Sequence, residues 1–427
     1  MKAKILMLSG GLVVLVLAVL GLQFVYDPGS KIASVPVADL NAQIARGAYL
    51  AHAGDCAVCH TVRGGKPYAG GRAIATQYGT FYTPNVTPDR LTGIGTWSSD
   101  DFWLAMHNGK SKDGKFLYPA FPFTDYTKIV RPDSDALFAY FKSLEPVSQT
   151  NREHDLHFPF NQRILLAGWR TLYFRPGIYE SDPAQSVQWN RGAYLVQGLG
   201  HCNDCHTSRN SLGAGDRKRE LDGGQMPQQS WYAPSLTSDA EAGLARWEEA
   251  DIAALLKTGT STHGAVFGPM AEVVSESMQH LDDADINAVA AYLKTLPQQQ
   301  SSEAPDGIDD TPELRKTLAF GARLYEKHCR DCHQANGRGN GSVYPPLAGN
   351  HALTTRSSVN VIRMVLNGGY APSTQGNPRP FGMPPFGPAL NDAEVAALVT
   401  YVRCSWGNQA GPVTPAEVAR YRGVPPE

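Results

Sequence analysis

The spacing of hydrophobic residues predicts a chain built mainly from helices. Three segments begin with an acidic residue and then carry apolar residues at intervals of three and four, which is the pattern of an amphipathic helix. These segments are Asp135–Leu144, Asp285–Leu296 and Asp392–Val402. We therefore expect an all-α fold in which each of these helices closes one packed region.

A second set of three segments predicts an internal repeat. Each contains a Gly-Ala pair, ends in Leu and precedes a pair of cysteines: Arg46–Leu50, Arg191–Leu195 and Phe320–Leu324. Between the two sets, Thr83–Thr87 resembles Ala233–Thr237. A repeat of this length indicates three related globular domains rather than a solenoid. The predicted domains cover residues 38–147, 186–298 and 312–408, and a C-terminal tail covers 409–427.

The N-terminus has a different pattern. Lys2 and Lys4 precede a run from Ile5 to Val25 that is almost wholly apolar. A run of about 20 apolar residues is long enough to span a membrane, and a basic start is typical of a secretory signal. Residues 1–26 are therefore predicted to be a signal peptide or a retained membrane anchor, with the bulk of the chain outside the cytoplasm. The alternatives are a buried core helix and a soluble carrier released by cleavage near residue 27.

Composition narrows the possible partners. The chain of 427 residues contains 42 Gly and 30 Pro, which predicts many loops. Its 38 Lys and Arg against 40 Asp and Glu give a net charge of -2, and no basic stripe is present. We therefore expect no nucleic-acid partner.

Six of the seven cysteines form three Cys-x-x-Cys pairs, and each pair is followed directly by His. The three motifs are Cys56, Cys59 and His60; Cys202, Cys205 and His206; and Cys329, Cys332 and His333. Only Cys404 lies outside the pattern. We interpret it as a buried, unreactive thiol.

This motif is the attachment sequence of c-type haem, in which the two thiols form thioethers and the adjacent histidine binds the iron. A thioredoxin-like site would need a βαβ context, and tetrahedral zinc would need two cysteine pairs in each site. A disulfide is permitted in an exported chain, but two intervening residues would make an unusual brace. Three copies at one place in a repeat therefore predict three covalently bound haem c groups, with His60, His206 and His333 as ligands.

Methionines on loops before the closing helices are candidates for the sixth iron ligand. Met383 lies 18 residues before Tyr401, and Met270 lies 22 residues before Tyr292. A Met flanked by Gly and Pro is not a typical core residue, whereas a thioether is a common axial ligand in cytochromes c. We therefore predict Met270 and Met383 as ligands.

The first domain departs from this pattern. Phe121 stands 19 residues before Tyr140, and Phe cannot bind iron. Met106 and His107 are the nearby residues with suitable side chains, although core packing also explains Met106. The sequence leaves three alternatives for this haem: ligation by Met106, ligation by His107, or five-coordinate iron.

Longer strings around these motifs resemble the triheme cytochrome c subunit of bacterial membrane-bound dehydrogenases of the alcohol, gluconate, sorbitol and aldehyde type. The strings that carry the resemblance are Arg46–His60, Thr83–Trp97, Leu117–Pro122, Gly192–His206, Phe267–Val274 and Met383–Trp406. The resemblance implies three tandem cytochrome c-like domains that take electrons from a catalytic subunit and pass them to ubiquinone or another respiratory acceptor. Many members have Met where this chain has Phe121.

The sequence therefore predicts two candidate functions. The first is an electron-transfer subunit with no catalytic site of its own, on the periplasmic side of the bacterial inner membrane. Its partner dehydrogenase subunit would carry flavin, quinone or a molybdenum cofactor. The second is a haem enzyme, a peroxidase or reductase, that uses an open iron in the first domain.

Overall fold

The structure is a computed structural model, and it describes residues 18, 21–23, 32–34, 39–226, 230–238, 241, 244–298, 310–341 and 343–424. The segment predicted as a signal or anchor lies almost entirely outside these residues. Among the helices of the described part, none combines the length and the apolar character needed to cross a membrane.

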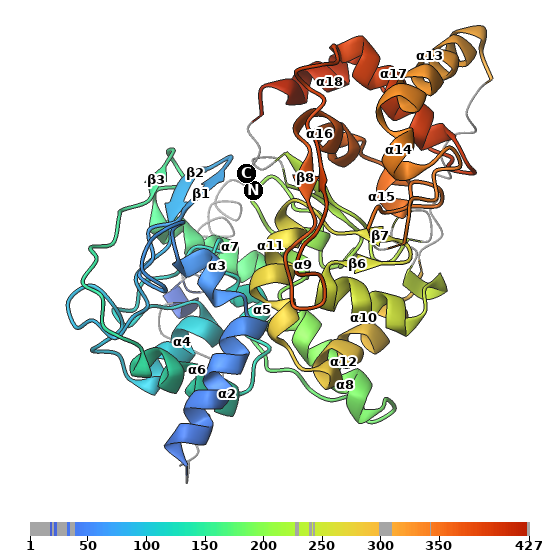
Figure 1. Ribbon diagram of the computed structural model, residues 1–427. Helices are drawn as coiled ribbons and strands as arrows, with labels where there is room; N and C mark the ends of the chain where they lie inside the picture. Colours follow the sequence, from blue (N-terminus) through green and yellow to red (C-terminus); the bar gives the residue numbers. More distant parts are fainter. Residues whose placement is uncertain are drawn as a thin grey trace, which may run out of the picture. The chain divides into compact units, whose positions relative to one another are not determined.

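The chain forms two compact units, coloured blue to green and green to red along the sequence in Figure 1. The first unit contains the described residues up to Asp182, together with Tyr194–His201 and Asn210–Ala214. The second unit contains Pro183–Ala193, Cys202–Arg209 and the chain from Gly215 onward.

Helices dominate both units. The first unit contains α2 (Leu40–Ala53), α3 (Cys56–His60), α4 (Ser99–Asn108), α5 (Phe123–Tyr126), α6 (Arg131–Ser143) and α7 (Leu166–Tyr173). Helix α8 (Val187–Gln197) has residues in both units. The second unit adds α9 (Asn203–His206), α10 (Glu249–Thr258), α11 (Pro269–Glu276), α12 (Asp283–Lys294), α13 (Pro312–His328), α14 (Arg330–His333), α15 (His351–Thr354), α16 (Val359–Asn367), α17 (Asp392–Cys404) and α18 (Pro415–Arg422). The expectation of a mostly helical protein is confirmed.

Short antiparallel strands join these helices, and the sequence pattern did not predict them. The first unit has β1 (Ala73–Thr76), β2 (Gly79–Tyr82) and β3 (Asp155–Leu156) in one sheet, with Ala73 opposite Tyr82 and Thr76 opposite Gly79. Within its described residues, the second unit has three two-stranded ribbons. They pair β4 (Gly224–Met226) with β5 (Trp231–Ala233), β6 (Thr260–Ser261) with β7 (Gly264–Ala265), and β8 (Gly369–Tyr370) with β9 (Gly382–Met383).

Local sequence explains where several helices begin. Ser98 caps α4 in a capping box, because its hydroxyl accepts the Asp101 N–H while the Asp101 carboxylate accepts the Ser98 N–H. Asn391 and Glu394 form the same box at α17. Helix α13 begins with Thr311 as its cap and proline at its first turn.

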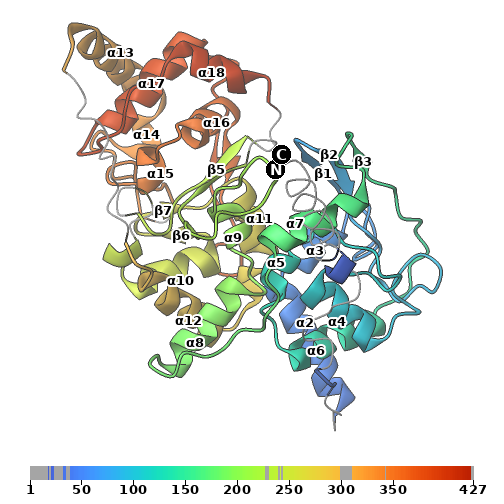
Figure 2. The ribbon, with the colours of Figure 1, turned by 180° about the vertical axis from the view of Figure 1, so that it is seen from behind.

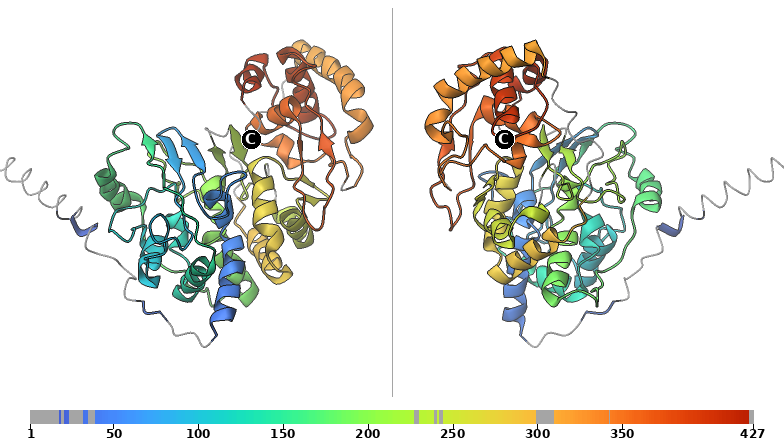
Figure 3. Two further views of the ribbon diagram at one scale, coloured as in Figure 1. Left: turned by 60° about the vertical axis from the view of Figure 1, so that its left-hand side comes forward. Right: turned by 90° about the vertical axis from the view of Figure 1, so that its right-hand side faces the viewer.

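The opening and closing helices of each repeat cross at a glycine. A Cβ atom on Gly47 of α2 would lie 1.9 Å from the carbonyl oxygen of Ala136 in α6. The corresponding distance is also 1.9 Å from Gly192 of α8 to Ala288 in α12. For Gly321 of α13, the long orange helix in Figure 3, it is 2.2 Å to the carbonyl oxygen of Ala397 in α17. Only glycine permits so close an approach of two backbones.

An ion pair reinforces this crossing in two of the repeats. Arg46 on α2 binds Asp133 on α6 at 2.5 Å, and Arg191 on α8 binds Asp285 on α12 at 2.6 Å. The contacts therefore make Asp133 the counterpart of Asp285. Asp133 lies two residues before Asp135, where the closing helix of the first repeat was expected to begin, because α6 begins earlier, at Arg131.

The core of the third repeat lies between α13, α16, α17 and α18, three of which are labelled close together in Figure 2. Fully buried residues on these helices include Ile362, Val395, Val399 and Val418. Phe320, Cys329 and Met383 are partly buried and pack against this cluster. One thiol of the third motif and one predicted methionine ligand thus contact the same core.

Candidate haem-binding sites

Each Cys-x-x-Cys-His motif forms a short helix directly after the opening helix of its repeat. Helix α3 begins at Cys56 and ends at His60. Cys202 precedes α9 and Cys329 precedes α14, and each of these helices ends at the motif histidine. Because each motif is a short helical segment, each repeat offers two thiols and one imidazole close together in the chain.

The motif cysteines are half-buried. Burial, followed by the charges of Asp55 and Cys59, raises the pKa of Cys56 well above its usual range. Burial and Cys332 raise the pKa of Cys329 to about 12. Two half-buried thiols at one short helix are the groups through which haem c is attached.

All three motif histidines make the same hydrogen bond to a proline carbonyl. The Nδ1 atoms of His60, His206 and His333 lie 2.7, 2.8 and 3.0 Å from the oxygens of Pro84, Pro234 and Pro345, respectively. A carbonyl oxygen only accepts, so Nδ1 carries the proton and the lone pair is on Nε2. This bond fixes the tautomer and the ring orientation that an axial iron ligand needs.

The electrostatics of these histidines agree with that role. Burial lowers the pKa of His60, His206 and His333, while the bond to the proline carbonyl opposes the shift in each case. A neutral imidazole is the form that binds metal ions.

Two buried indole groups in the second unit add to the fit. The Nε1 atoms of Trp231 and Trp247 are buried and, within the described residues, have no hydrogen-bond partner. A buried N–H without an acceptor is costly and unusual in a native fold. The carboxylate groups of a haem are acceptors of the required kind. The thiols and the imidazoles of the motifs fit haem c.

The predicted methionine ligands lie at the ends of short elements. Met270 is the second residue of α11, just after Gly268, where a Cβ atom would approach the Trp231 ring to 2.8 Å. Met383 ends β9 and packs against the third core with Cys329. Both side chains are half-buried. Their role as ligands stays a prediction.

The first repeat holds its two ligand candidates inside α4. Met106 and His107 are 5% and 2% exposed. The His107 Nδ1 atom donates to Thr127 O at 2.9 Å, and its ring stacks on Trp103 with centroids 4.4 Å apart. Burial lowers the pKa of His107 to about 4. The choice between Met106, His107 and five-coordinate iron therefore stays open.

Phe121 lies close to the first motif. Its ring packs edge-on against Tyr126 at 5.4 Å, and the Tyr126 hydroxyl donates to Gly54 O at 3.0 Å. Gly54 stands two residues before Cys56, and a Cβ atom there would be 3.3 Å from the Cys56 sulfur. The residue that replaces the expected ligand thus belongs to the surroundings of this motif.

The sequence did not reveal the three proline carbonyls. They stand 24, 28 and 12 residues after their histidines, so no fixed spacing identifies them. A signal was nevertheless present, because Pro84 and Pro234 occupy the same place in the matched strings Thr83–Thr87 and Ala233–Thr237.

Comparison with known proteins agrees with this geometry. The cytochrome c family model matches residues 190–297 and 318–406. The chain is 40% identical to the gluconate 2-dehydrogenase cytochrome c subunit of Pantoea cypripedii over 399 residues, which is 90% of each chain. It is 38% identical to the cytochrome c subunit of the quinone-type alcohol dehydrogenase of Gluconobacter oxydans, over 89% of this chain and 82% of the relative. It is 35% identical to the fructose dehydrogenase cytochrome subunit of Gluconobacter japonicus, with the same coverage. Because these similarities extend over most of both chains, the chain belongs to the family of dehydrogenase cytochrome c subunits.

Proposed function

We propose that this chain is the electron-transfer subunit of a dehydrogenase complex and carries three covalently bound haem c groups. The observation that carries the proposal is the threefold recurrence of one arrangement. In each repeat, a short helix presents two thiols and a histidine whose Nδ1 atom is held by a proline carbonyl. The family relationship supports the same function, since the relatives are cytochrome subunits of dehydrogenases.

The residues of the chain would bind each haem c and set its reduction potential. A bound haem c would supply reversible one-electron chemistry. The cysteine pairs would hold the group covalently, and His60, His206 and His333 would supply one axial nitrogen each. Met270 and Met383 would supply thioether ligands, which raise a reduction potential. The half-buried position of each motif limits the access of water, which also influences the potential.

The partner and the acceptor follow from the chemistry of the relatives. We infer that a catalytic subunit with flavin, quinone or a molybdenum cofactor delivers the electrons, and that ubiquinone or another respiratory acceptor receives them. The apolar segment Ile5–Val25 supports a location on the periplasmic side of the bacterial inner membrane. Fractionation tests this location: the chain should sediment with membranes, and a mature chain that begins near residue 27 in the soluble fraction would contradict an anchor.

The haem number is tested directly by intact mass. The protein from cells that attach haem should exceed the polypeptide mass by three haems, and Cys59→Ala should lose or weaken only the first attachment. Cys404→Ala is the matched control, because Cys404 lies outside the motifs and its thiol donates to Ala410 O at 3.1 Å. A mass equal to that of the bare polypeptide would overturn the proposal.

Phe121 favours one alternative, a haem enzyme that uses an open iron in the first repeat. A high-spin haem that binds cyanide or carbon monoxide rapidly would support this second function. Three low-spin haems that do not react with these ligands would exclude it and leave electron transfer.

A further inference from the structure

A single peptide group connects the second motif histidine to a buried carboxylate. The carbonyl oxygen of Pro234 accepts from His206 Nδ1 at 2.8 Å. The N–H of the same peptide group belongs to Ser235, and it donates to a Glu241 carboxylate oxygen at 2.7 Å. Two hydrogen bonds therefore join the imidazole and the carboxylate through one polarisable amide.

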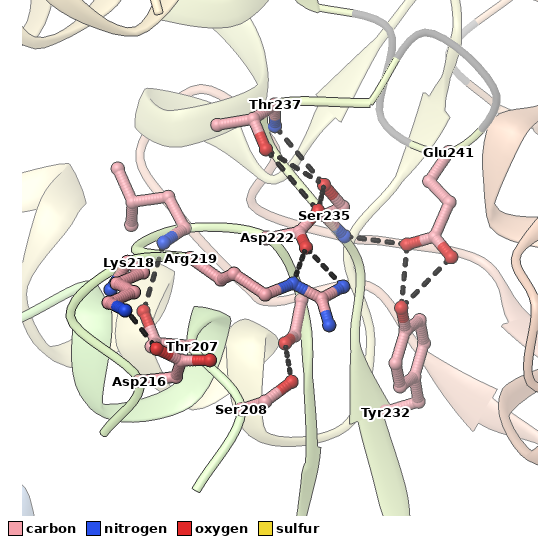
Figure 4. A network of polar contacts seen from close by, with 12 residues as sticks. Thr207, Ser208, Asp216, Lys218, Arg219, Asp222, Tyr232, Ser235, Thr237 and Glu241 are labelled. Carbon is pink, nitrogen blue, oxygen red and sulfur yellow. Dashed lines mark hydrogen bonds and ion pairs between the residues drawn. The ribbon is translucent and has the colours of Figure 1, made fainter. Parts of the chain in front are cut away.

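Glu241 is held firmly in this position, as Figure 4 shows. It is 6% exposed. The Tyr232 hydroxyl donates to both of its oxygens at 2.9 and 2.7 Å, and the Arg356 backbone N–H donates to one of them at 3.2 Å. The donors are a phenol and backbone amides, which are uncharged groups. These donors hold both carboxylate oxygens in place, and a charge acts strongly in a buried site.

The relay, meaning the two hydrogen bonds that run from the histidine through the peptide group, ends at a different partner in each of the other two repeats. In the first repeat, the peptide N–H after Pro84 belongs to Asn85 and donates to the neutral side-chain oxygen of Asn151 at 2.7 Å. In the third repeat, residue 346 is also proline, so the peptide after Pro345 has no N–H to donate. The peptide N–H that follows the proline carbonyl thus donates to a neutral amide oxygen in the first repeat and to a carboxylate in the second. In the third repeat this N–H does not exist.

We propose that Glu241 is a positioning residue that lowers the reduction potential of the haem bound by His206. The inference rests on the proposed function, since it requires a haem at that motif. The Glu241 charge polarises the intervening peptide, so the Pro234 oxygen attracts the Nδ1 proton more strongly. The imidazole then becomes a more basic ligand, and a more basic ligand stabilises the oxidised iron.

Glu241→Gln tests the inference, because it keeps the size of the side chain and removes its charge. The readout is a spectroelectrochemical titration of the intact haem-loaded protein. One of three one-electron waves should move to higher potential, with about a tenfold larger ratio of reduced to oxidised haem at a fixed poise. For a one-electron couple, tenfold corresponds to about 59 mV.

Glu248→Gln is the matched control, because it removes the same charge from a carboxylate in the same unit whose side chain is 82% exposed. It should leave all three waves in place, since solvent screens an exposed charge. If Glu248→Gln moved the same wave as far as Glu241→Gln, the effect would be one of net charge and the proposal would fail.

Asn151→Asp makes the opposite change in the first repeat, because it adds a negative charge instead of removing one. It would place a carboxylate at the end of that relay, and a different wave should move to lower potential. The expected change is smaller, about threefold, because Asn151 is exposed. If the Glu241→Gln protein does not fold and bind its haems, the Asn151→Asp variant tests the inference instead. Three waves that stay in place in both variants would overturn the inference, whereas fewer than three waves in the unaltered protein would overturn the proposed haem number.

Discussion

His154 in the first unit is a half-buried base whose neutral form accepts a backbone hydrogen bond. Its Nδ1 atom accepts the Tyr82 backbone N–H at 3.2 Å, and its ring lies 5.3 Å from that of Phe81 and 5.5 Å from that of Tyr118. Burial lowers the pKa of His154, and the positive charge of Arg163 lowers it further. A proton on Nδ1 would also remove the acceptor that Tyr82 uses.

The consequence is a stability that falls in acid. A histidine in the unfolded chain has a pKa of about 6.5. Because the pKa of His154 is lower in the folded protein, the contribution of neutral His154 to the free energy of unfolding is complete above about pH 6.5. This contribution is lost as the pH falls from there toward the folded pKa. His154→Gln keeps an acceptor that does not titrate, so we expect its unfolding free energy to change less between pH 7.5 and pH 5. Denaturant titrations at the two pH values measure this difference.

His157→Gln provides the comparison, because His157 is three residues away and exposed. It should keep the full pH dependence of the unaltered protein. An equal loss of pH dependence in both variants would show that His154 is not the group responsible.

Individual residues differed in how far the sequence could identify them. The motif cysteines and histidines could be identified from the sequence, because covalent attachment of haem requires them to be close together in the chain. The proline carbonyls and Glu241 could not, since their function depends on backbone geometry between distant positions. A carboxylate such as Glu241 looks like any solvated acid until its burial and its three donors are known. The methionine ligands lie between these cases and stay predictions.

At the scale of elements, the crossing of α13 and α17 predicts an unusual response to a Gly→Ala change. Alanine normally stabilises a helix by about 1 kcal/mol relative to glycine. At Gly321, however, the added Cβ would lie 2.2 Å from the Ala397 oxygen and 2.7 Å from the Tyr401 Cβ. The helices must separate, and overpacking of this kind costs about 1–3 kcal/mol. Gly321→Ala should therefore lower the unfolding free energy measured by denaturant titration.

Ala319→Gly calibrates the helix propensity on the same helix. Ala319 is exposed, so this change should cost about 1 kcal/mol through propensity alone. Both variants should therefore destabilise the protein, although they are opposite substitutions. A Gly321→Ala protein more stable than the original would mean that the two backbones do not restrict each other.

The elements that the sequence predicted were those with long apolar periodicity. The three closing helices correspond to α6, α12 and α17, with ends within a few residues of the expected ones. The ribbons were missed because strands of two to four residues are too short to show an alternating pattern. The start of the first closing helix was expected at Asp135, whereas α6 begins at Arg131. Asp133 and Asp135 are both acidic residues near that start, and the contact with Arg46 of α2 distinguishes them.

At the scale of the whole molecule, the sequence repeat and the compact units describe different properties. The repeat reflects three copies of one local arrangement, whereas the second unit joins most of the second copy to the third. No periodicity along the chain could have revealed this, because the joining contacts involve residues that the copies do not share. The division into three domains therefore stays a prediction about ancestry and haem number.

Asn360 is the clearest of these joining residues. It lies on α16 and is 6% exposed, and its side chain acts like the edge of a strand. Its amide nitrogen donates to Tyr232 O at 2.7 Å, and its oxygen accepts the Tyr232 N–H at 3.0 Å. Tyr232 in turn holds Glu241, so the third copy supports the surroundings of the second motif.

Asn360→Ala should therefore weaken the second unit as a whole. The change leaves the backbone groups of Tyr232 without their partners, and each buried unsatisfied group costs about 1–3 kcal/mol. We expect a lower unfolding midpoint for the second unit in calorimetry, together with a shifted wave for one haem, because Tyr232 and Glu241 lose their support. Asn340→Ala, at an exposed position of the third copy, should stay within about 0.5 kcal/mol of the original. If the two variants unfolded alike, Asn360 would not join the copies, and the second and third repeats would be independent in stability.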